Sequence, residues 1–562
     1  MLLLSKNNSV VKTQVNKDLQ NSLSPLTVTQ CTSDFSARLS HSEEPKNCFS
    51  LYPTVSQLVK HFILLAQPLL IFNARHWQAA TTIITSAMDE NYPQLALQNY
   101  DQQKLFGRLN LHKGQLVEFV QGEIYNFNNG CLILDISPLL ISPDLWFFLK
   151  SFLINRTLPT TAAVNSDMLQ GAYPIQSPEK LNTKIILVTT RYQLDELAQI
   201  DPEYNQISSL FTELPSEIKT TDKNIHALQA YCTQLIKQRG LPAVSTDALA
   251  LLFFYLSSKC EHQKKILFSP ELIENILRYA ALFIHNETQI SAVHLQKALD
   301  IQTQAKSLAQ NFSEQSLLEK QLKIQLTGKK TGQINGLSVI ELLGYPTEFG
   351  EIFRISTSDM IGDGEIIDIE RKVDLAGNVH AKSTLIVQSY LHHIFTHIAN
   401  FPLSCNVVFE QSYQESDGDS AALAILLAVT SCYAQQPLPQ NLFVTGALDQ
   451  HGNVLAIGGI NQKINAVTRL FKLGLLNESV TILIPQANQI NLTLTQETLQ
   501  LIENKQIQIY AIDHCWEAFP LAMGLSFEDV IALINERIEY LQREELDIHP
   551  IGFLQRFIPQ FK

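Results

Sequence analysis

The chain has 562 residues, of which 45% are hydrophobic and 17% are charged, and its formal net charge is −13. That length predicts three or four domains with substantial cores. The negative charge argues against nucleic acid as the main partner. The sequence contains no run of about 18 apolar residues, so we expect no membrane span. The eight cysteines lack Cys-x-x-Cys spacing, so we expect reduced thiols, no zinc site and a cytoplasmic location.

Residues 1–50 are rich in Ser, Asn, Gln and Thr and show no sustained periodicity. This composition predicts an N-terminal segment that is flexible or only loosely docked.

The next feature is a strand predicted over 67–72, followed by a loop that departs from phosphate-binding chemistry. A nucleotide-binding loop at this place would read Gly-x-x-x-x-Gly-Lys-Ser/Thr, with backbone N–H groups around the phosphates. The chain has instead Asn73, Ala74, Arg75, His76, Trp77, Gln78, Ala79 and Ala80. Without glycine or lysine, and with Trp77 crowding the space, this loop offers no cradle for a triphosphate.

Two further strands follow, at 131–135 and 184–190, and after them come a connecting stretch at 210–252 and helical patterns at 271–299. Asp135 ends the first strand at a position typical of a Mg²⁺ ligand, but Ile136 replaces the glutamate that would position water. We therefore favour a structural role for Asp135. The order of elements resembles an AAA+ ATPase module that has lost its nucleotide chemistry, with an α/β domain at 51–215 and a helical lid at 216–322. The resemblance implies ATP binding, the altered loop argues against it, and no cofactor is expected.

Ser420 lies in the motif Asp417-Gly418-Asp419-Ser420-Ala421-Ala422 and opens a long apolar run. That run predicts a buried helix. Because Asp419 and Ser420 are residue types that cap helices, we expect the hydroxyl at a helix N-terminus, where unpaired backbone N–H groups can hold an oxyanion.

Lys463 follows Gly458-Gly459 and lies in a second predicted helix that Asn461 could cap. The positive end of the helix dipole and burial beside Ile460 both disfavour a charged amine. A neutral amine can take the proton of a serine hydroxyl. Judged from the two residue types alone, a surface lysine and a helix-capping serine are the commoner explanation.

Several separated motifs change that balance. The stretch 332–521 resembles the proteolytic domain of the Lon protease family, peptidase S16, and is nearer to its archaeal membrane-type branch. The matching motifs are the Ser420 motif, Thr445-Gly446-Ala447, the stretch 452–459 that leads to Lys463, and Ile484-Pro485-Gln486-Ala487-Asn488. Ala422 and Ala447 depart from the family pattern. The resemblance implies a Lon-type α/β proteolytic domain at 323–525, with a C-terminal helix and tail at 526–562.

Carried over by position, the resemblance implies that Ser420 is the nucleophile, Lys463 the general base and Thr445 a residue that holds the lysine. Asp417 and Asp419 match acidic positions that tune the lysine or block a resting site, and helix capping explains them equally well. The resemblance also implies a serine endopeptidase that cleaves unfolded proteins or peptides and assembles as a closed homo-oligomeric ring, commonly a hexamer.

Three other functions are alternatives for this sequence. Gly418–Ala422 is similar to the nucleophile elbow of α/β-hydrolases, but that elbow needs a strand leading straight into the serine, and here the strand pattern ends near Phe409. A catalytically inactive Lon-derived scaffold that binds polypeptides or regulates a partner is the main alternative, and a nucleotide switch at 73–80 is the third.

His393 and His397 have helical spacing without an acidic partner, so no metal site is expected. The peptidase motifs are better preserved than the phosphate loop, which favours the enzyme.

Overall fold

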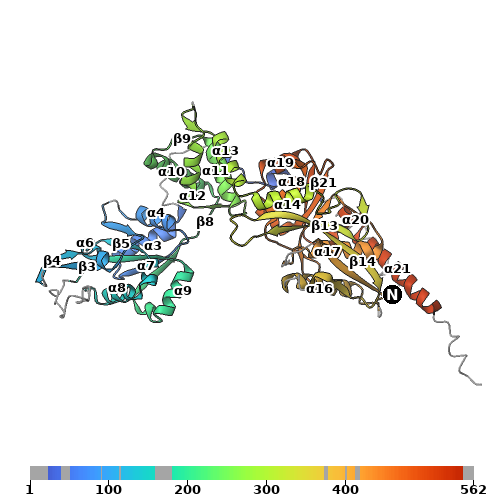
Figure 1. The fold of residues 1–562 in the computed structure, drawn as a ribbon, viewed down its shortest axis with the longest axis horizontal. Helices are drawn as coiled ribbons and strands as arrows, with labels where there is room; N and C mark the ends of the chain where they lie inside the picture. Colours follow the sequence, from blue (N-terminus) through green and yellow to red (C-terminus); the bar gives the residue numbers. More distant parts are fainter. Residues whose placement is uncertain are drawn as a thin grey trace, which may run out of the picture. The chain divides into compact units, whose positions relative to one another are not determined.

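The computed structural model describes residues 23–39, 51–89, 91–112, 115–157, 180–285, 287–372, 378–398, 401–411 and 418–548. They belong to two compact units (Figure 1). Unit 1 lies within 1–33, 261–263 and 301–562, and unit 2 lies within 34–260 and 264–300. Each unit has its own sheet covered by helices, which confirms the mixed α/β class. The individual domain boundaries expected from the sequence remain predictions.

Unit 2 is built on a parallel sheet with strand order β2-β5-β6-β1-β7. The strands are β1 (Leu69–Asn73), β2 (Gln94–Leu97), β5 (Cys131–Asp135), β6 (Lys184–Thr189) and β7 (Ser209–Glu213). The central strands are apolar except at their ends, because both faces of the sheet are covered. Alternate residues of β1 therefore enter two different cores, with Leu70 in one and Leu69 in the other.

The remaining elements of this α/β part connect or cover its strands. They are α2 (Ser36–Leu39), α3 (Pro53–Leu64), α4 (Trp77–Ala87), α5 (Gln102–Phe106), β3 (Gly107–His112), β4 (Gln115–Gln121), α6 (Glu123–Asn126), α7 (Ser137–Ile141), α8 (Pro143–Asn155), α9 (Arg191–Ile200) and η3 (Tyr204–Gln206).

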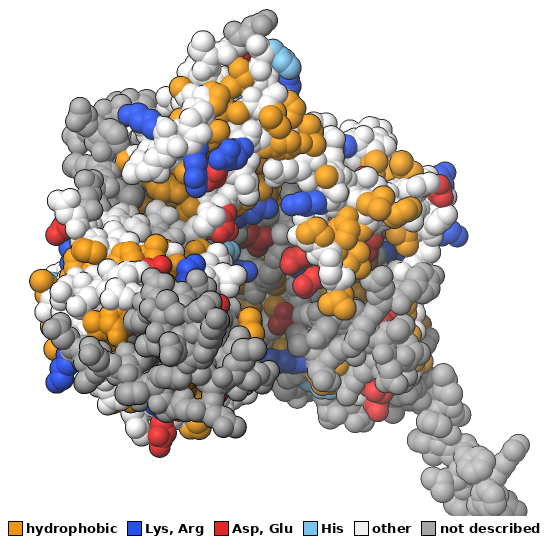
Figure 2. Space-filling model, turned by 60° about the vertical axis from the view of Figure 1, so that its left-hand side comes forward, with side chains coloured by type: hydrophobic (Ala, Val, Ile, Leu, Met, Phe, Trp, Pro, Cys, Tyr) orange, Lys and Arg blue, Asp and Glu red, His pale blue; other side chains and the backbone are white. Residues whose placement is uncertain are grey.

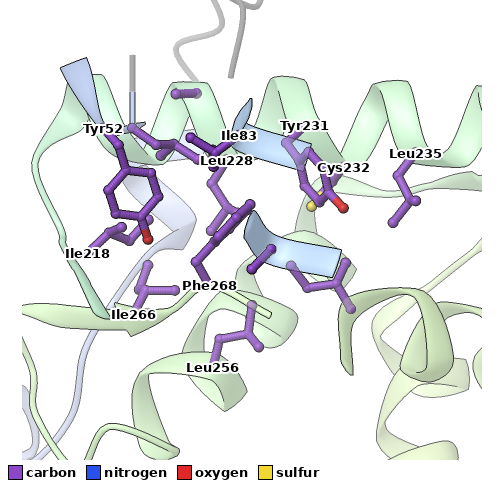
Figure 3. Packing of buried hydrophobic residues seen from close by; sticks show 14 of the residues in the cluster. Tyr52, Ile83, Ile218, Leu228, Tyr231, Cys232, Leu235, Leu256, Ile266 and Phe268 are labelled. Atoms are coloured by element: carbon purple, nitrogen blue, oxygen red, sulfur yellow. The ribbon is translucent and has the colours of Figure 1, made fainter. Parts of the chain in front are cut away.

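The helical part of unit 2 shares one continuous core with the sheet. Phe268 lies between Tyr52 and Tyr231, with ring centroids 5.9 and 5.3 Å away in edge-on geometry (Figure 3). Such pairs add about 0.5–1.5 kcal/mol each to the burial of their surface. The elements here are β8 (Glu217–Lys219), α10 (Asp222–Arg239), β9 (Ala243–Val244), α11 (Thr246–Ser258), β10 (Lys265–Leu267), α12 (Pro270–Ala281), β11 (Gln289–Ile290) and α13 (Ala292–Gln304).

Unit 1 is built on a mixed seven-stranded sheet with order β15-β16-β14-β13-β18-β21-β22. Its strands are β13 (Gln333–Ile340), β14 (Phe349–Ile361), β15 (Ile366–Asp368), β16 (Leu403–Glu410), β18 (Leu442–Val444), β21 (Val480–Pro485) and β22 (Ile507–Ile512). Strands β13, β18, β21 and β22 are mutually parallel, whereas β14 runs antiparallel to both β13 and β16.

Smaller strands and helices complete unit 1. They are η1 (Val28–Gln30), α14 (Leu308–Leu318), β12 (Lys329–Lys330), α15 (Ile369–Lys372), α16 (Asn378–Ile394), α17 (Ala422–Ala434), β17 (Leu438–Pro439), β19 (Ala447–Leu448), β20 (Val454–Leu455), α18 (Ile460–Lys472), η4 (Gln486–Asn491), α19 (Gln496–Glu503), η5 (Cys515–Glu517), α20 (Ala518–Met523) and α21 (Phe527–Ile548).

The two faces of this sheet carry separate cores. Helices α16, α17, α20 and α21 pack on one face, and α18 and α19 pack on the other. Strand β18 shows the division, because Val444 belongs to the α17 core and Phe443 to the α18 core. All 13 residues of α17 are buried, which fits its apolar sequence on every side.

Part of the polar N-terminal segment is packed rather than flexible, which corrects the expectation from composition. Leu26 and Cys31 are buried in unit 1, where the Leu26 N–H donates to the carbonyl of Ile509 at 2.8 Å. Phe35 and Leu39 are buried in unit 2. Four apolar side chains thus anchor a stretch whose average composition is polar.

The predicted C-terminal amphipathic helix is present as α21 and extends to Ile548. Ile534 and Ile538 are buried in the α17 core. Arg537 donates to the carbonyls of Cys432 and Tyr433, at 2.9 and 3.0 Å, and pairs with Asp359. Because these carbonyls end α17, the arginine satisfies acceptors that the helix itself leaves open.

On the face drawn in Figure 2, apolar side chains lie among charged and other polar ones. Among the described residues, every helix is either too short or too polar to cross a bilayer.

We expect Ile534→Ala to destabilise unit 1, because it removes a fully buried side chain from the core that holds α17. Substitutions of this kind cost about 2–5 kcal/mol. Tyr540→Ala, on the same helix but 60% exposed, should change stability by no more than about 0.5 kcal/mol. Denaturant unfolding of the full chain measures both, and equal midpoints for the two variants would contradict the packing of α21.

Candidate active site

Ser420 lies in a turn just before α17, and its side chain does not cap that helix. The N-cap residue is Ala421, which has helical backbone angles and gives no side-chain cap. The turn is held by its backbone instead: the Ala422 N–H donates to the carbonyl of Asp419 at 3.1 Å, and the Gly446 N–H donates to that of Ser420 at 2.8 Å. Ser420 thus lies at the N-terminus of α17 as expected, although neither it nor Asp419 is the cap of that helix, and its hydroxyl is available to other partners.

Lys463 is the fourth residue of α18, and the cap of this helix also differs from expectation. Gly459 is the N-cap, with a φ of +63° in the left-handed region that favours glycine. Asn461, the expected cap, lies inside the helix and is buried. Its side chain donates to the carbonyl of Asn491 at 2.9 Å and accepts from the N–H of Thr493 at 2.8 Å.

The structure brings three of the sequence-predicted residues together. Lys463 Nζ lies 2.8 Å from Ser420 Oγ and 3.3 Å from Thr445 Oγ1. Thr445 Oγ1 also donates to the carbonyl of Ser420 at 3.3 Å. The lysine is 3% exposed and the threonine is fully buried, whereas Ser420 is partly exposed, so the amine is shielded from water while the hydroxyl lies at the edge of the cluster.

The cluster forms at the carboxyl end of β18, where Thr445 and Gly446 follow the strand. Helix α17 precedes β18 on one face of the sheet, and α18 follows it on the other. In sheets with parallel strands, such a change of face opens a crevice at the strand ends, and binding sites recur there. The serine and the lysine thus come from opposite faces and meet at one strand end.

Burial is the main influence on the lysine. It lowers the pKa of Lys463 to about 8, while the negative charge of Asp419 acts in the opposite direction. A buried ammonium loses its hydration, so the neutral form gains in population near neutral pH. Asp419 is therefore a charged neighbour of the lysine. Asp417, the other acidic residue of the motif, lies outside the described residues.

A buried asparagine that sequence reasoning quoted only as part of a motif holds the approach to α18. Asn488 accepts from the N–H of Ile457 and donates to its carbonyl, both at 2.9 Å. This two-point contact fixes the backbone just before the Gly458-Gly459 turn. In the sequence it is one of several polar residues within 486–491, and only its place in the motif distinguishes it from them.

The two departures from the family pattern both lie in packed positions. Ala422 and Ala447 are 1% and 2% exposed. Small uncharged side chains suit such places, because a buried carboxylate would need a partner.

In unit 2, the segment 73–80 does not fit a triphosphate. The Ala74 N–H donates to the carbonyl of Thr189 at 2.8 Å and so extends the sheet. The neighbouring cavity measures about 10 Å³, room for about one water molecule, and is lined by Ala74, Arg75, His76, Ala79, Leu214, Pro215, Ser216 and Phe268. Trp77 begins α4 and packs against the core.

Asp135 has structural partners in the folded chain. Its carboxylate accepts from the N–H of Ser137 at 2.8 Å, which caps α7, and its carbonyl accepts from the hydroxyl of Tyr100 at 2.6 Å. Ile136 is completely buried. These contacts agree with a structural role for this strand end.

Within the described ranges, no three His, Cys, Asp or Glu side chains are grouped as a metal site would need. Helix α16 ends at Ile394, so His393 and His397 do not share a helical face as their spacing suggested.

Comparison with known proteins agrees with this geometry. Residues 314–523 match the family model of the Lon protease (S16) C-terminal proteolytic domain, and residues 90–214 match that of the LonB-like AAA domain. The chain is 32% identical over 465 residues to a Lon protease homolog of Haemophilus influenzae, covering 81% of this chain and 76% of the relative.

A Lon protease homolog of Escherichia coli is 31% identical over 84% of this chain and 82% of its own length. The archaeal Lon protease of Methanocaldococcus jannaschii is 26% identical over 64% of this chain and 54% of its own. With both parts matched in their expected order, the chain belongs to the Lon protease family.

Proposed function

We propose that the chain is a serine endopeptidase that cleaves unfolded polypeptides with Ser420 as nucleophile and Lys463 as general base. The observation that carries this proposal is the 2.8 Å contact between the hydroxyl and a buried amine whose pKa is lowered to about 8. An amine in that state can accept a proton from the alcohol it touches.

The proposed reaction has two halves. Ser420 Oγ attacks the scissile carbonyl as its proton passes to Lys463 Nζ, and the protonated lysine then gives that proton to the leaving amine. Water, deprotonated by the same lysine, hydrolyses the acyl-enzyme and returns the serine. Thr445 orients the lysine through its 3.3 Å contact. The N–H groups of Ser420 and Ala421 have no acceptor among the described residues and are suited to hold the oxyanion.

We propose that this peptidase works without productive ATP hydrolysis of its own. The support is the segment 73–80, which has no glycine or lysine and whose Ala74 N–H is already bonded within the sheet. No nucleotide or other cofactor enters the proposed reaction. Substrates in this proposal are polypeptides that are already unfolded.

The oligomeric state and the cellular location are further proposals. We propose a homo-oligomeric ring, a hexamer by analogy. A cytoplasmic location is supported by the seven cysteines in the described residues, all of which are free thiols. The main alternative function remains a catalytically inactive polypeptide-binding scaffold, and the intact contact between Ser420 and Lys463 favours the enzyme over it.

Ser420→Ala and Lys463→Met should each reduce cleavage of casein or a fluorogenic peptide by about three orders of magnitude or more, because they remove the nucleophile or its base. Lys472→Met is the matched control on the same helix, since that lysine is 55% exposed, and it should retain full activity. Circular dichroism checks that each variant is folded. Substantial cleavage by folded Ser420→Ala would refute the nucleophile.

The pH profile of kcat/KM should rise with a midpoint near 8, since only the neutral amine accepts the proton of the serine and the pKa of Lys463 is lowered to about 8. At two pH units below the midpoint, about one amine in a hundred is neutral. A peptide without titrating groups, assayed between pH 6 and 10, measures this. A profile that is flat across that range would contradict a lysine base.

Millimolar ATP with Mg²⁺ should leave the thermal unfolding temperature and the rate of peptide cleavage unchanged. A ligand present at a hundred times its Kd would stabilise the folded chain by about 2.7 kcal/mol, which a melting experiment detects readily. ADP serves as the second nucleotide. A nucleotide-dependent rise of several degrees would show that the altered loop still binds phosphates.

A further inference from the structure

The first turn of α18, which carries Lys463, lies directly against the β13–β14 hairpin. A side chain at Gly350 would place its Cβ 2.0 Å from the carbonyl oxygen of Gln462 and 3.0 Å from the backbone nitrogen of Lys463. A Cβ on Gly459 would lie 2.4 Å from Val339 Cγ2. Val339 and Gly350 are paired across the hairpin. The hairpin therefore touches the lysine turn at two points where only glycine fits.

Arg469, two turns further along α18, holds the same part of the hairpin. Its guanidinium donates to the carbonyl of Gly350, and its Nε lies 2.9 Å from Glu314 Oε1 on α14. The arginine side chain is 17% exposed and the glutamate side chain 20%. One largely buried cation thus joins the lysine helix, the hairpin and α14.

Helix α14 is fastened to the hairpin on its own account. Ser313 Oγ donates to Glu351 Oε1 at 2.5 Å, beside Gly350. The Ala309 N–H donates to the hydroxyl of Tyr345 in the hairpin loop at 3.2 Å. Gln310 Nε2 donates to the carboxylate of Glu314 at 2.7 Å. Glu314, the carboxylate that orients Arg469, is therefore held by a hydrogen bond within α14, and α14 is itself held to the hairpin.

Taking the Arg469 and Glu314 charges out of water costs free energy, so the pair needs a geometric reason to be there. Burial lowers the pKa of Arg469, and Glu314 and Glu351 act in the opposite direction. An apolar pair of similar volume often stabilises a core as well as a buried ion pair does. The planar guanidinium has a property that an apolar pair lacks, because its fixed fork sets the relative position of two acceptors.

We propose that Arg469 and Glu314 are positioning residues for Lys463, which press the hairpin at Gly350 against the first turn of the lysine helix. The inference rests on the proposed function, because it concerns the base of that reaction. Neither residue touches Ser420 or the reacting atoms.

Two effects should follow if the hairpin loosens. A displacement of about 1 Å at a reacting group can reduce the rate about 100-fold, and the 2.8 Å contact between Lys463 and Ser420 has little slack. Looser packing also admits water to the amine, which favours its charged form. The rate should therefore fall, and the midpoint of the pH profile should move upwards.

Other charged groups near α18 have to stay constant in such a test. Asp419 faces the amine from the serine turn. Acidic groups that the described residues place around the helix also include Glu351 on β14, Glu261 beside Gln462, Glu314 on α14 and Glu497 beside Lys472 on α19. The variants below change only the proposed pair and one exposed pair.

The test compares Arg469→Gln, Glu314→Gln and Lys472→Gln in the full chain. Lys472→Gln is the matched control, because it breaks an exposed ion pair with Glu497 on the same helix. Arg469→Gln should lower kcat by about 10- to 100-fold and raise the pH midpoint, with KM nearly unchanged. Glu314→Gln should cause smaller changes of the same sign, because the contact with Gly350 remains. The control should match the wild type in all three quantities.

A stabilising role alone would lower the unfolding temperature without moving the pH midpoint. Folded Arg469→Gln and Glu314→Gln proteins with wild-type kcat and pH midpoint would overturn the proposal, and Glu314→Gln decides the matter if Arg469→Gln does not fold. Labelling by a serine-directed covalent inhibitor distinguishes failure of the peptidase proposal from failure of the positioning proposal. If wild-type Ser420 stays unlabelled, the peptidase proposal fails together with this one. If it is labelled and the variants behave as wild type, only the positioning role fails.

Discussion

The chemistry proposed for unit 1 depends on one amine that is kept out of contact with water beside one alcohol. Lys463 is almost completely buried, and burial lowers its pKa to about 8. Burying a lysine without a carboxylate in hydrogen-bonding contact costs stability, so the surroundings must be held in place by stronger interactions. The entirely buried helix α17, the two-point contact of Asn488 and the close approach at Gly459 supply that support. The site is a destabilising feature that a rigid core tolerates.

The division of the sheet into two cores explains why the contact is sensitive to packing. Ser420 is carried by the core that contains α17, and Lys463 by the core that contains α18. Thr445 comes from the strand between them and bonds to both sides. A change of packing in either core alters the distance between hydroxyl and amine. Residues far from the reacting atoms, such as Arg469, can therefore influence the base.

Unit 2 combines a complete AAA-type fold with a segment at 73–80 that lacks the phosphate-loop motif. The parallel sheet and helical part share a complete core, and Ile136 and Trp77 contribute apolar surface where phosphate chemistry would need polar groups. Function depends on particular sites and not on the architecture. The loss of the phosphate loop therefore says little about the peptidase, whose site lies in a separate unit with its own cores.

The sequence predicted the strands at 67–72, 131–135 and 184–190, the buried helix after Ser420 and the residues that meet at the site, because apolar periodicity and motif spacing are encoded locally. It misplaced both helix caps. Capping preferences are worth only about 1 kcal/mol, and tertiary contacts override them: Gly459 is needed where Val339 leaves no room for a Cβ, and Asn461 is drawn into contacts with a neighbouring segment. The pair of Glu314 and Arg469 was invisible for a related reason. Each is an ordinary charged residue on a helix, and only the fold shows that they pair in a largely buried position, with Arg469 against Gly350. Local patterns thus identify what reacts, and long-range packing determines how well it is held.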